Sequence, residues 1–136
     1  MKVYIDSDII LDIFLNRELF VSESSQILSL CEDKHIIGYT TTLALANIYY
    51  LLNKFDKNKS IKALEYLREI LIVLAISDEE LGLSINSKFK DFEDGIQNFA
   101  AEKANCEIII TRNIKDYRTS KLDIKTANEF LRILQL

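Results

Sequence analysis

Short apolar runs rich in Ile, Val and Tyr alternate along this chain with segments whose apolar residues recur at helical spacing. The runs predict strands at 3–5, 36–40, 72–76 and 108–110, with a short fifth strand at 123–125. The segments between them predict helices at 9–15, 22–31, 43–53, 59–71 and 91–104. Such alternation produces a parallel sheet covered by helices on both faces. We therefore expect a three-layer α/β/α fold with a short, mainly parallel central sheet.

Two capping motifs predict further helix starts. Ser77 and Glu80 are three residues apart, and so are Thr126 and Glu129. In this capping-box spacing the hydroxyl and the carboxylate satisfy the first free amides of a helix. We therefore expect one helix after each motif, the second running through about Leu134.

The chain shows no repeat, no low-complexity tract, no linker and no proline, which predicts a single domain over residues 1–136. The apolar run 70–76 is too short to cross a membrane and predicts a strand buried on both faces. Helix 43–53 is almost entirely apolar, so we expect it to be buried, with Tyr49 and Tyr50 in the core. Acidic residues interrupt the apolar N-terminus, so we expect no signal or membrane segment and a cytoplasmic protein.

Counts of single residue types exclude several kinds of site. One histidine, His35, cannot build a two-histidine zinc motif and is expected on the surface. Cys31 and Cys106 are far apart in the sequence and have no CxxC spacing, so we expect two buried thiols in a reduced compartment. Three glycines, at positions 38, 82 and 95, cannot form the common phosphate-binding loops.

Acidic and amide side chains follow the first and fourth strands. Asp6 comes directly after the first strand, and Asn113 and Asp116 follow the fourth. Asp94 lies in the first turn of the helix that leads into the fourth strand. In doubly wound sheets, ligands bind beyond the carboxyl ends of the strands, where the strand order reverses. If strands one and four are neighbours, these four side chains converge.

Oxygen ligands without sulfur or imidazole favour hard cations such as Mg²⁺ or Mn²⁺. A cation also offsets the repulsion among clustered carboxylates. A metal held in this way activates water and neutralises charge on a leaving oxygen, so phosphodiester hydrolysis is the chemistry that these residues suggest. That reaction needs no histidine.

Each acid also has a structural interpretation when it is taken alone. Asp91 fits a helix N-cap and Asp94 a first-turn acid, where negative charge stabilises a helix. Asp116 fits a turn. Asp8 and Asp12 are expected to be a helix cap and part of an exposed helix face, rather than ligands.

Four segments together resemble the PIN-domain family, of the kind that serves as ribonuclease toxins in VapC-type toxin–antitoxin pairs. In chain order they read VYIDSDIILDIFLNRE, ANIYYLL, DFEDGIQNFAAEKANCEIIITRNIKDY and TANEFL. They span almost the whole chain, and the long third segment is the most specific. The resemblance implies an α/β/α domain that binds Mg²⁺ or Mn²⁺ and cleaves RNA. It also implies an antitoxin partner and a homodimer.

The resemblance assigns roles by position. Asp6, Asp94 and Asp116 match the acids expected to be catalytic, and the same three residues with Asn113 match the expected metal ligands. Asp91 is an additional acid and a further candidate ligand.

One position departs from the family pattern. The buried helix usually offers a glutamate near its start, where this chain has Asn47. An amide oxygen can ligate a metal but brings no charge, so we expect weaker cation binding, especially of a second ion. The substitution leaves open a second hypothesis, a weak or inactive PIN-like module that binds RNA or protein.

RNA binding requires a local basic patch, because the net charge of the chain is −4. The candidate cations are Arg17, Arg112, Lys115, Arg118 and Lys121, four of which follow the fourth strand. Contacts to phosphates would make binding weaken steeply with salt. The alternative is a solvated loop with scattered charge.

A third hypothesis is a haloacid-dehalogenase-like phosphatase with Asp6 as nucleophile and Asp8 as acid. That motif requires Gly and then Thr or Val after the second Asp, and Ile9 and Ile10 stand there instead. The sequence therefore favours the nuclease.

Overall fold

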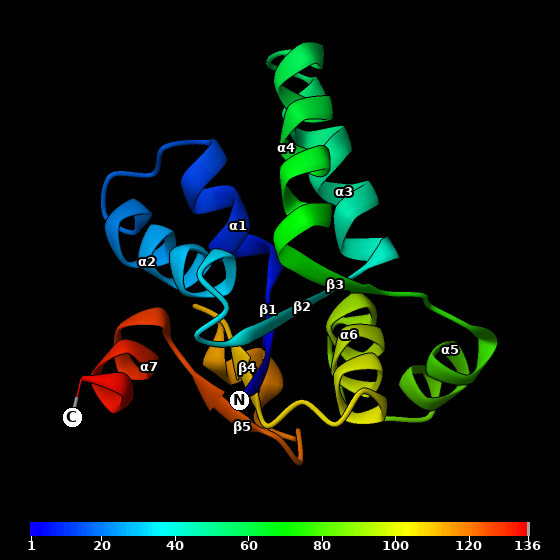
Figure 1. The fold of residues 1–136 in the computed structure, drawn as a ribbon. Coiled ribbons are helices and arrows are strands. Elements are labelled where there is room, and N and C mark those ends of the chain that lie inside the picture. The colour runs from blue at the N-terminus through cyan, green and yellow to red at the C-terminus, as the bar shows by residue number, and fades with distance from the viewer. Residues whose placement is uncertain (136) are drawn as a thin grey trace.

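The computed structural model describes residues 1–135 (Figure 1). Its elements are, in chain order, β1 (Lys2–Ile5), α1 (Ser7–Phe14), α2 (Val21–Glu32), β2 (Ile37–Thr41), α3 (Thr42–Asn53), α4 (Lys57–Ile70), β3 (Leu71–Leu74), α5 (Asp78–Ile85), α6 (Phe92–Lys103), β4 (Ile108–Ile110), the 3₁₀ helix η1 (Ile114–Tyr117), β5 (Asp123–Lys125) and α7 (Ala127–Leu134). Each predicted strand and helix is present, with ends shifted by a few residues. The α3–α4 hairpin projects from the rest of the molecule.

Within residues 1–135 the strands form one five-stranded parallel sheet in the order β3-β2-β1-β4-β5. Strands β1 and β4 are neighbours, which is the condition for the expected convergence of the acids that follow them. Their register places Ile5 beside Ile110, and the backbone N–H of Asp6 donates to the Ile110 carbonyl at 3.0 Å. The direction of winding changes at this pair, which is where doubly wound sheets bind ligands.

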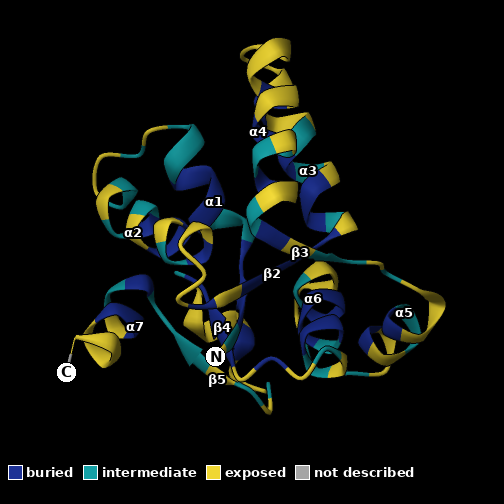
Figure 2. Cartoon of the chain, in the orientation of Figure 1, coloured by how far each residue is buried: buried dark blue, intermediate teal, exposed yellow. Residues whose placement is uncertain are grey.

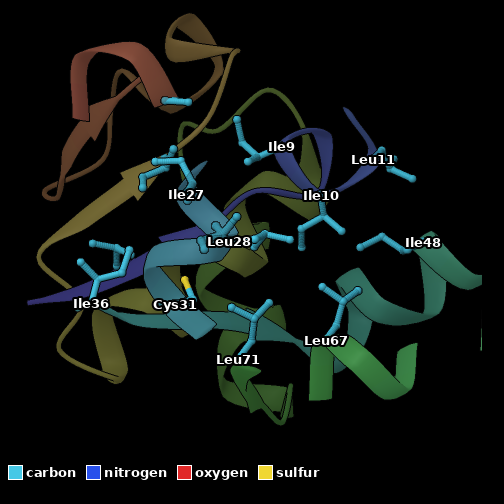
Figure 3. Packing of buried hydrophobic residues seen from close by; sticks show 14 of the residues in the cluster. Ile9, Ile10, Leu11, Ile27, Leu28, Cys31, Ile36, Ile48, Leu67 and Leu71 are labelled. Carbon is cyan, nitrogen blue, oxygen red and sulfur yellow. The ribbon is translucent and has the colours of Figure 1, made fainter. Parts of the chain in front are cut away.

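Alternation along the strands divides the core between the two faces of the sheet. Val3 and Ile5 face one side, where they pack with residues of α1, α2, α3, α4 and α7. Tyr4 faces the opposite side, where it packs with Ile109 and with Tyr117 of η1. Figure 3 shows the first of these cores, to which the labelled isoleucines and leucines of several helices contribute. The three-layer α/β/α prediction is therefore confirmed.

Two burial predictions are wrong, and the strand order explains the first. β3 lies at the edge of the sheet, so Ile72 is 48% exposed rather than buried on both faces. Residue 70 ends α4 instead of joining the strand. In α3 one face packs on the core, but Tyr50 is exposed and Tyr49 is half-buried. Figure 2 shows exposed residues along much of the α3–α4 hairpin.

Several local predictions are confirmed. Capping boxes begin α5 and α7, and Asp91 is the N-cap of α6. Cys31 and Cys106 are buried free thiols, and His35 is exposed. Within residues 1–135, no helix has both the length and the apolar content needed to span a bilayer.

The roles predicted for two acids of α1 are wrong. Asp6, and not Asp8, is the N-cap of α1. Asp12 is completely buried rather than on an exposed face. It forms ion pairs with Arg112 at 2.9 Å and Arg17 at 3.2 Å, so its burial is explained by charge pairing.

The Asp12 ion pairs connect three segments of the chain. The second carboxylate oxygen accepts a hydrogen bond from Ser24 of α2, and the Arg112 guanidinium lies 4.1 Å from the ring centre of Phe20. Arg112 follows β4, so this cluster fixes the end of β4 to α1 and α2.

Asp12→Asn is expected to lower the free energy of unfolding by about 3 kcal/mol, because two guanidinium groups lose a buried partner. Urea denaturation of the variant measures this loss. Glu65→Gln removes the same charge from an exposed position of α4 and should change stability little. Equal stability of the two variants would contradict the assigned role of Asp12.

Candidate active site

Asp6 is the first residue of the candidate site. It leaves β1 at the carboxyl edge of the sheet and is 6% exposed. One carboxylate oxygen accepts from the backbone N–H of Ser7 at 2.8 Å, and the other accepts from the Thr111 hydroxyl at 2.7 Å. Thr111 follows β4, so the pairing of β1 with β4 also fixes the orientation of this carboxylate.

Asp94 reaches the site from the first turn of α6. The side chain of the N-cap Asp91 accepts from the Asp94 backbone N–H at 3.0 Å, which sets where the helix starts. The next residue, Gly95, lies against α5, and an added Cβ would clash with the Ser84 hydroxyl. A cap on one side and a close helix contact on the other therefore fix Asp94.

Tyr117 connects the helix to the sheet beneath the site. Its hydroxyl donates to Asp94 at 3.2 Å, and the ring is fully buried. Burial, and then the charges of Asp6 and Asp94, raise the pKa of Tyr117 well above its usual value. The hydroxyl therefore stays protonated and remains a hydrogen-bond donor to the acids.

Asp6 and Asp94 line one cleft of about 420 Å³. The other residues that line it are Ser7, Asn47, Tyr50, Leu51, Glu93 and Gln97. The amide of Asn47 donates to the Glu93 carboxylate at 2.9 Å. The cleft therefore lies between α1, α3 and α6, above the carboxyl end of β1.

Electrostatics set buried Asp6 and half-buried Asp94 apart from most other acids in the chain. Burial raises the pKa of Asp6 to about 6, and the charge of Asp94 adds to this effect. Burial also raises the pKa of Asp94 to about 6, with further increases from Asp91 and Asp116. Two carboxylates with raised pKa values in one cleft are typical of a functional site.

Three of the predicted ligands, Asn113, Asp116 and the exposed N-cap Asp91, are not among the residues that line this cleft. The Asn113 amide donates to Asp8 at 3.2 Å, and burial followed by the charge of Asp6 raises the pKa of Asp8 to about 7. Asp116 is exposed on η1 and lines a neighbouring cleft, although its charge contributes to the raised pKa of Asp94. Asn47, in contrast, lines the cleft with Asp6 and Asp94.

The predicted RNA-binding residues divide into two groups. Arg17 and Arg112 form ion pairs with buried Asp12, which gives them a structural role. Lys115 and Arg118 are exposed and line the cleft that contains Asp116.

Sequence reasoning missed three residues around the cleft. Gln97 lies three residues after Asp94 on α6, so helical spacing from Asp94 could have indicated it. Glu93 is adjacent to Asp94 in the sequence, but it lies four residues before Gln97 and so shares a face of α6 with Gln97. The Gln97 side chain also accepts from the buried Tyr4 hydroxyl. Nothing in the sequence shows that Tyr117, seven residues beyond the end of β4, folds back beneath Asp94.

The donor chemistry of the cleft fits a hard divalent cation. Its polar side chains offer carboxylate, amide and hydroxyl oxygens. Among residues 1–135, no three side chains of the His, Cys, Asp and Glu types are close enough together to enclose a metal by themselves. Mg²⁺ is commonly held by only one or two carboxylates, with water and substrate phosphate as its other ligands. Asp6 and Asp94 match that pattern.

Comparison with known proteins gives the family. A model of the PIN domain matches residues 2–115 of this chain. The chain belongs to the PIN-domain family. Over 134 residues this PIN domain is 28% identical to Ribonuclease VapC1 of Aquifex aeolicus (strain VF5), a match that covers 95% of this chain and 92% of that protein.

Two solved structures share the PIN fold with this chain. One is VapBC2 from Rickettsia felis bound to a DNA fragment from its promoter, with a TM-score of 0.70, 18% identity and coverage of 93% of this chain and 98% of that chain. The other is a toxin–antitoxin complex from Klebsiella pneumoniae, with a TM-score of 0.67, 20% identity and coverage of 92% and 97%. They support the three-layer architecture described above.

Asp94→Asn is expected to raise the melting temperature of the metal-free PIN domain at about pH 7.5 and to leave it unchanged near pH 4. The folded-state pKa of Asp94 is raised, so ionisation destabilises the fold as pH rises from the ordinary Asp value to about 6. Thermal melts in EDTA at the two pH values measure the difference. The exposed variant Asp33→Asn should show no such difference, and a lower melting temperature of Asp94→Asn at high pH would contradict the account.

Proposed function

We propose that this chain is a divalent-metal-dependent endoribonuclease, the toxin of a type II toxin–antitoxin pair. The observation that carries the proposal is the cleft in which Asp6 and Asp94 lie together with raised pKa values. Its 28% identity to a protein named Ribonuclease VapC1 supports the choice of RNA as substrate. Mg²⁺ or Mn²⁺ is the proposed cofactor, because both prefer oxygen ligands.

In this mechanism Asp6 and Asp94 would hold the cation, with Asp116, Asn113 and Asp91 as further candidate ligands. The bound cation would supply an activated water and would offset charge on the scissile phosphate. Thr111 and Tyr117 donate hydrogen bonds to the two carboxylates and keep them oriented toward the cleft. Preorganised groups of this kind reduce reorganisation during the reaction.

Glu93 offers a carboxylate near the position where Asn47 replaces the usual acid. Because Asn47 donates to Glu93, the amide directs this carboxylate toward α3 within the cleft. This contact supports an active nuclease over the second candidate, an inactive PIN-like module that binds RNA or protein. The phosphatase hypothesis remains disfavoured by Ile9 and Ile10, which stand where that motif requires Gly and then Thr or Val.

The proposal includes protein partners. An antitoxin is proposed because fold relatives are described as VapBC2 and as a toxin–antitoxin complex. Assembly as a homodimer rests on the family resemblance alone, whereas the proposed cytoplasmic location rests on the sparse cysteine content of the chain.

Asp6→Asn and Asp94→Asn should each abolish cleavage of RNA, because each removes a charged oxygen ligand from the cleft. EDTA should abolish cleavage by the unchanged protein, and Mn²⁺ or Mg²⁺ should restore it. Gel analysis of a labelled RNA measures these effects, and thermal melts confirm that the variants are folded. Full activity in EDTA, or in both variants, would reject the metal-dependent nuclease.

Asn47→Glu should tighten Mn²⁺ binding, on the order of tenfold, because a negative oxygen ligand replaces a neutral one in the cleft. Isothermal titration calorimetry measures the dissociation constant directly. Asn53→Glu adds the same charge at the exposed end of α3 and is the matched control. Equal affinities in the two variants would show that residue 47 does not face the cation.

A further inference from the structure

We name the cleft that contains Asp6 and Asp94 the acidic cleft. A second cleft, of about 430 Å³, is lined mainly by side chains of the opposite charge. Four of its lining side chains are cationic, from Lys88, Lys90, Lys115 and Arg118. Among residues 1–135, Asp116 is the one acid that lines this cleft, and Thr119 adds a hydroxyl. We name this feature the basic cleft. It combines two segments that are distant in the sequence, the loop before α6 and the η1 region after β4.

Within the part of the chain that the structure describes, the four cations of the basic cleft differ from Arg112 in having no ion-pair partner. Lys88, Lys90, Lys115 and Arg118 are all exposed, and among residues 1–135 none of them has a carboxylate partner within ion-pair distance. Arg112, by comparison, already pairs with buried Asp12. The four side chains of the basic cleft are therefore available to an external anion.

Both segments of the basic cleft are connected to Asp94, which lines the cleft that contains Asp6. Lys90 directly precedes Asp91, the N-cap of the helix that carries Asp94, and Lys88 lies three residues before Asp91. On the other segment, Lys115 and Arg118 flank Tyr117, whose hydroxyl donates to Asp94. The charge of Asp116, a residue of the basic cleft, also raises the pKa of Asp94. A strand with phosphates in the basic cleft would therefore pass close to the two acids.

We propose that the basic cleft binds the phosphate backbone of a single-stranded RNA on its way to Asp6 and Asp94, with Lys88 and Lys90 as backbone contacts. This inference rests on the proposed nuclease function and adds a binding surface to it. Lysine and arginine contacts to phosphates supply sequence-independent affinity and position a strand. The acids themselves repel RNA, so an adjacent cationic surface is needed to hold the substrate there.

An acidic protein segment, such as part of an antitoxin, is the competing occupant of the basic cleft. RNA is favoured because both segments of the basic cleft lead to Asp94, one through the N-cap Asp91 and the other through Tyr117. A partner that only covers the acids would not require cations on both flanking segments.

The test is fluorescence anisotropy of a labelled single-stranded oligoribonucleotide with the full chain in EDTA, which prevents metal-dependent cleavage. Lys88→Gln/Lys90→Gln should weaken binding at low salt by about tenfold. The slope of log Kd against log salt should become shallower by about 0.7 for each lysine that contacted a phosphate. Thermal melts establish that the variant is folded.

Lys57→Gln/Lys59→Gln is the matched control, because it removes the same charge from exposed positions at the tip of the α3–α4 hairpin (Figure 1). It should leave affinity and slope close to those of the unchanged protein. Equal losses in both double variants would mean that only net charge matters, and would overturn the proposal. Unchanged RNA binding in Lys88→Gln/Lys90→Gln would also overturn it, and would leave the cleft to a protein partner.

A cleavage assay separates this proposal from the nuclease function. If the unchanged protein binds RNA with the expected salt slope but does not cleave it with Mn²⁺, the proposed nuclease fails and the basic cleft stands. If it cleaves RNA and the Lys88→Gln/Lys90→Gln variant binds RNA equally well, the nuclease stands and the basic cleft fails.

Discussion

Asp6 reaches the cleft because β1 is the central strand of the sheet and pairs with β4. The register that places Ile5 beside Ile110 brings the residue after each strand into contact, so the Thr111 hydroxyl donates to Asp6. The chain winds toward β3 on one side of β1 and toward β5 on the other. A crevice forms where the winding changes direction, and α6 brings Asp94 to it. The Asp12 ion pairs support the same junction by holding Arg112 against α1.

The site combines stabilising and destabilising contacts. Asp12 is buried with two guanidinium partners. Asp6 is buried and Asp94 half-buried in one cleft, and both have raised pKa values. Neutral hydroxyl donors, from Thr111 and Tyr117, offset only part of the unfavourable burial. A fold that keeps two such carboxylates is less stable than it could be, which is the expected relation between a binding site and its scaffold. A cation in the cleft would remove this penalty.

The sequence predicts the fold well, because strand runs, helical periodicity and capping motifs are local signals. It also predicts that Asp6 and Asp94 come together, since both lie at strand or helix ends that a parallel sheet brings to one edge. It fails where tertiary context decides burial. The exposure of Ile72 follows from the edge position of β3. The burial of Asp12 depends on its ion pair with Arg112, a residue that is distant in the sequence and is brought close only by folding. Tyr117 could not be predicted for the same reason.

An anomalous difference map from a crystal soaked in Mn²⁺ tests the central claim most directly, because it locates the cation without reference to activity. The account predicts a peak between the carboxylates of Asp6 and Asp94, with an oxygen of each at about 2.1 Å. A map with no peak in this cleft at high Mn²⁺ concentration, or with a peak that contacts neither carboxylate, would contradict it.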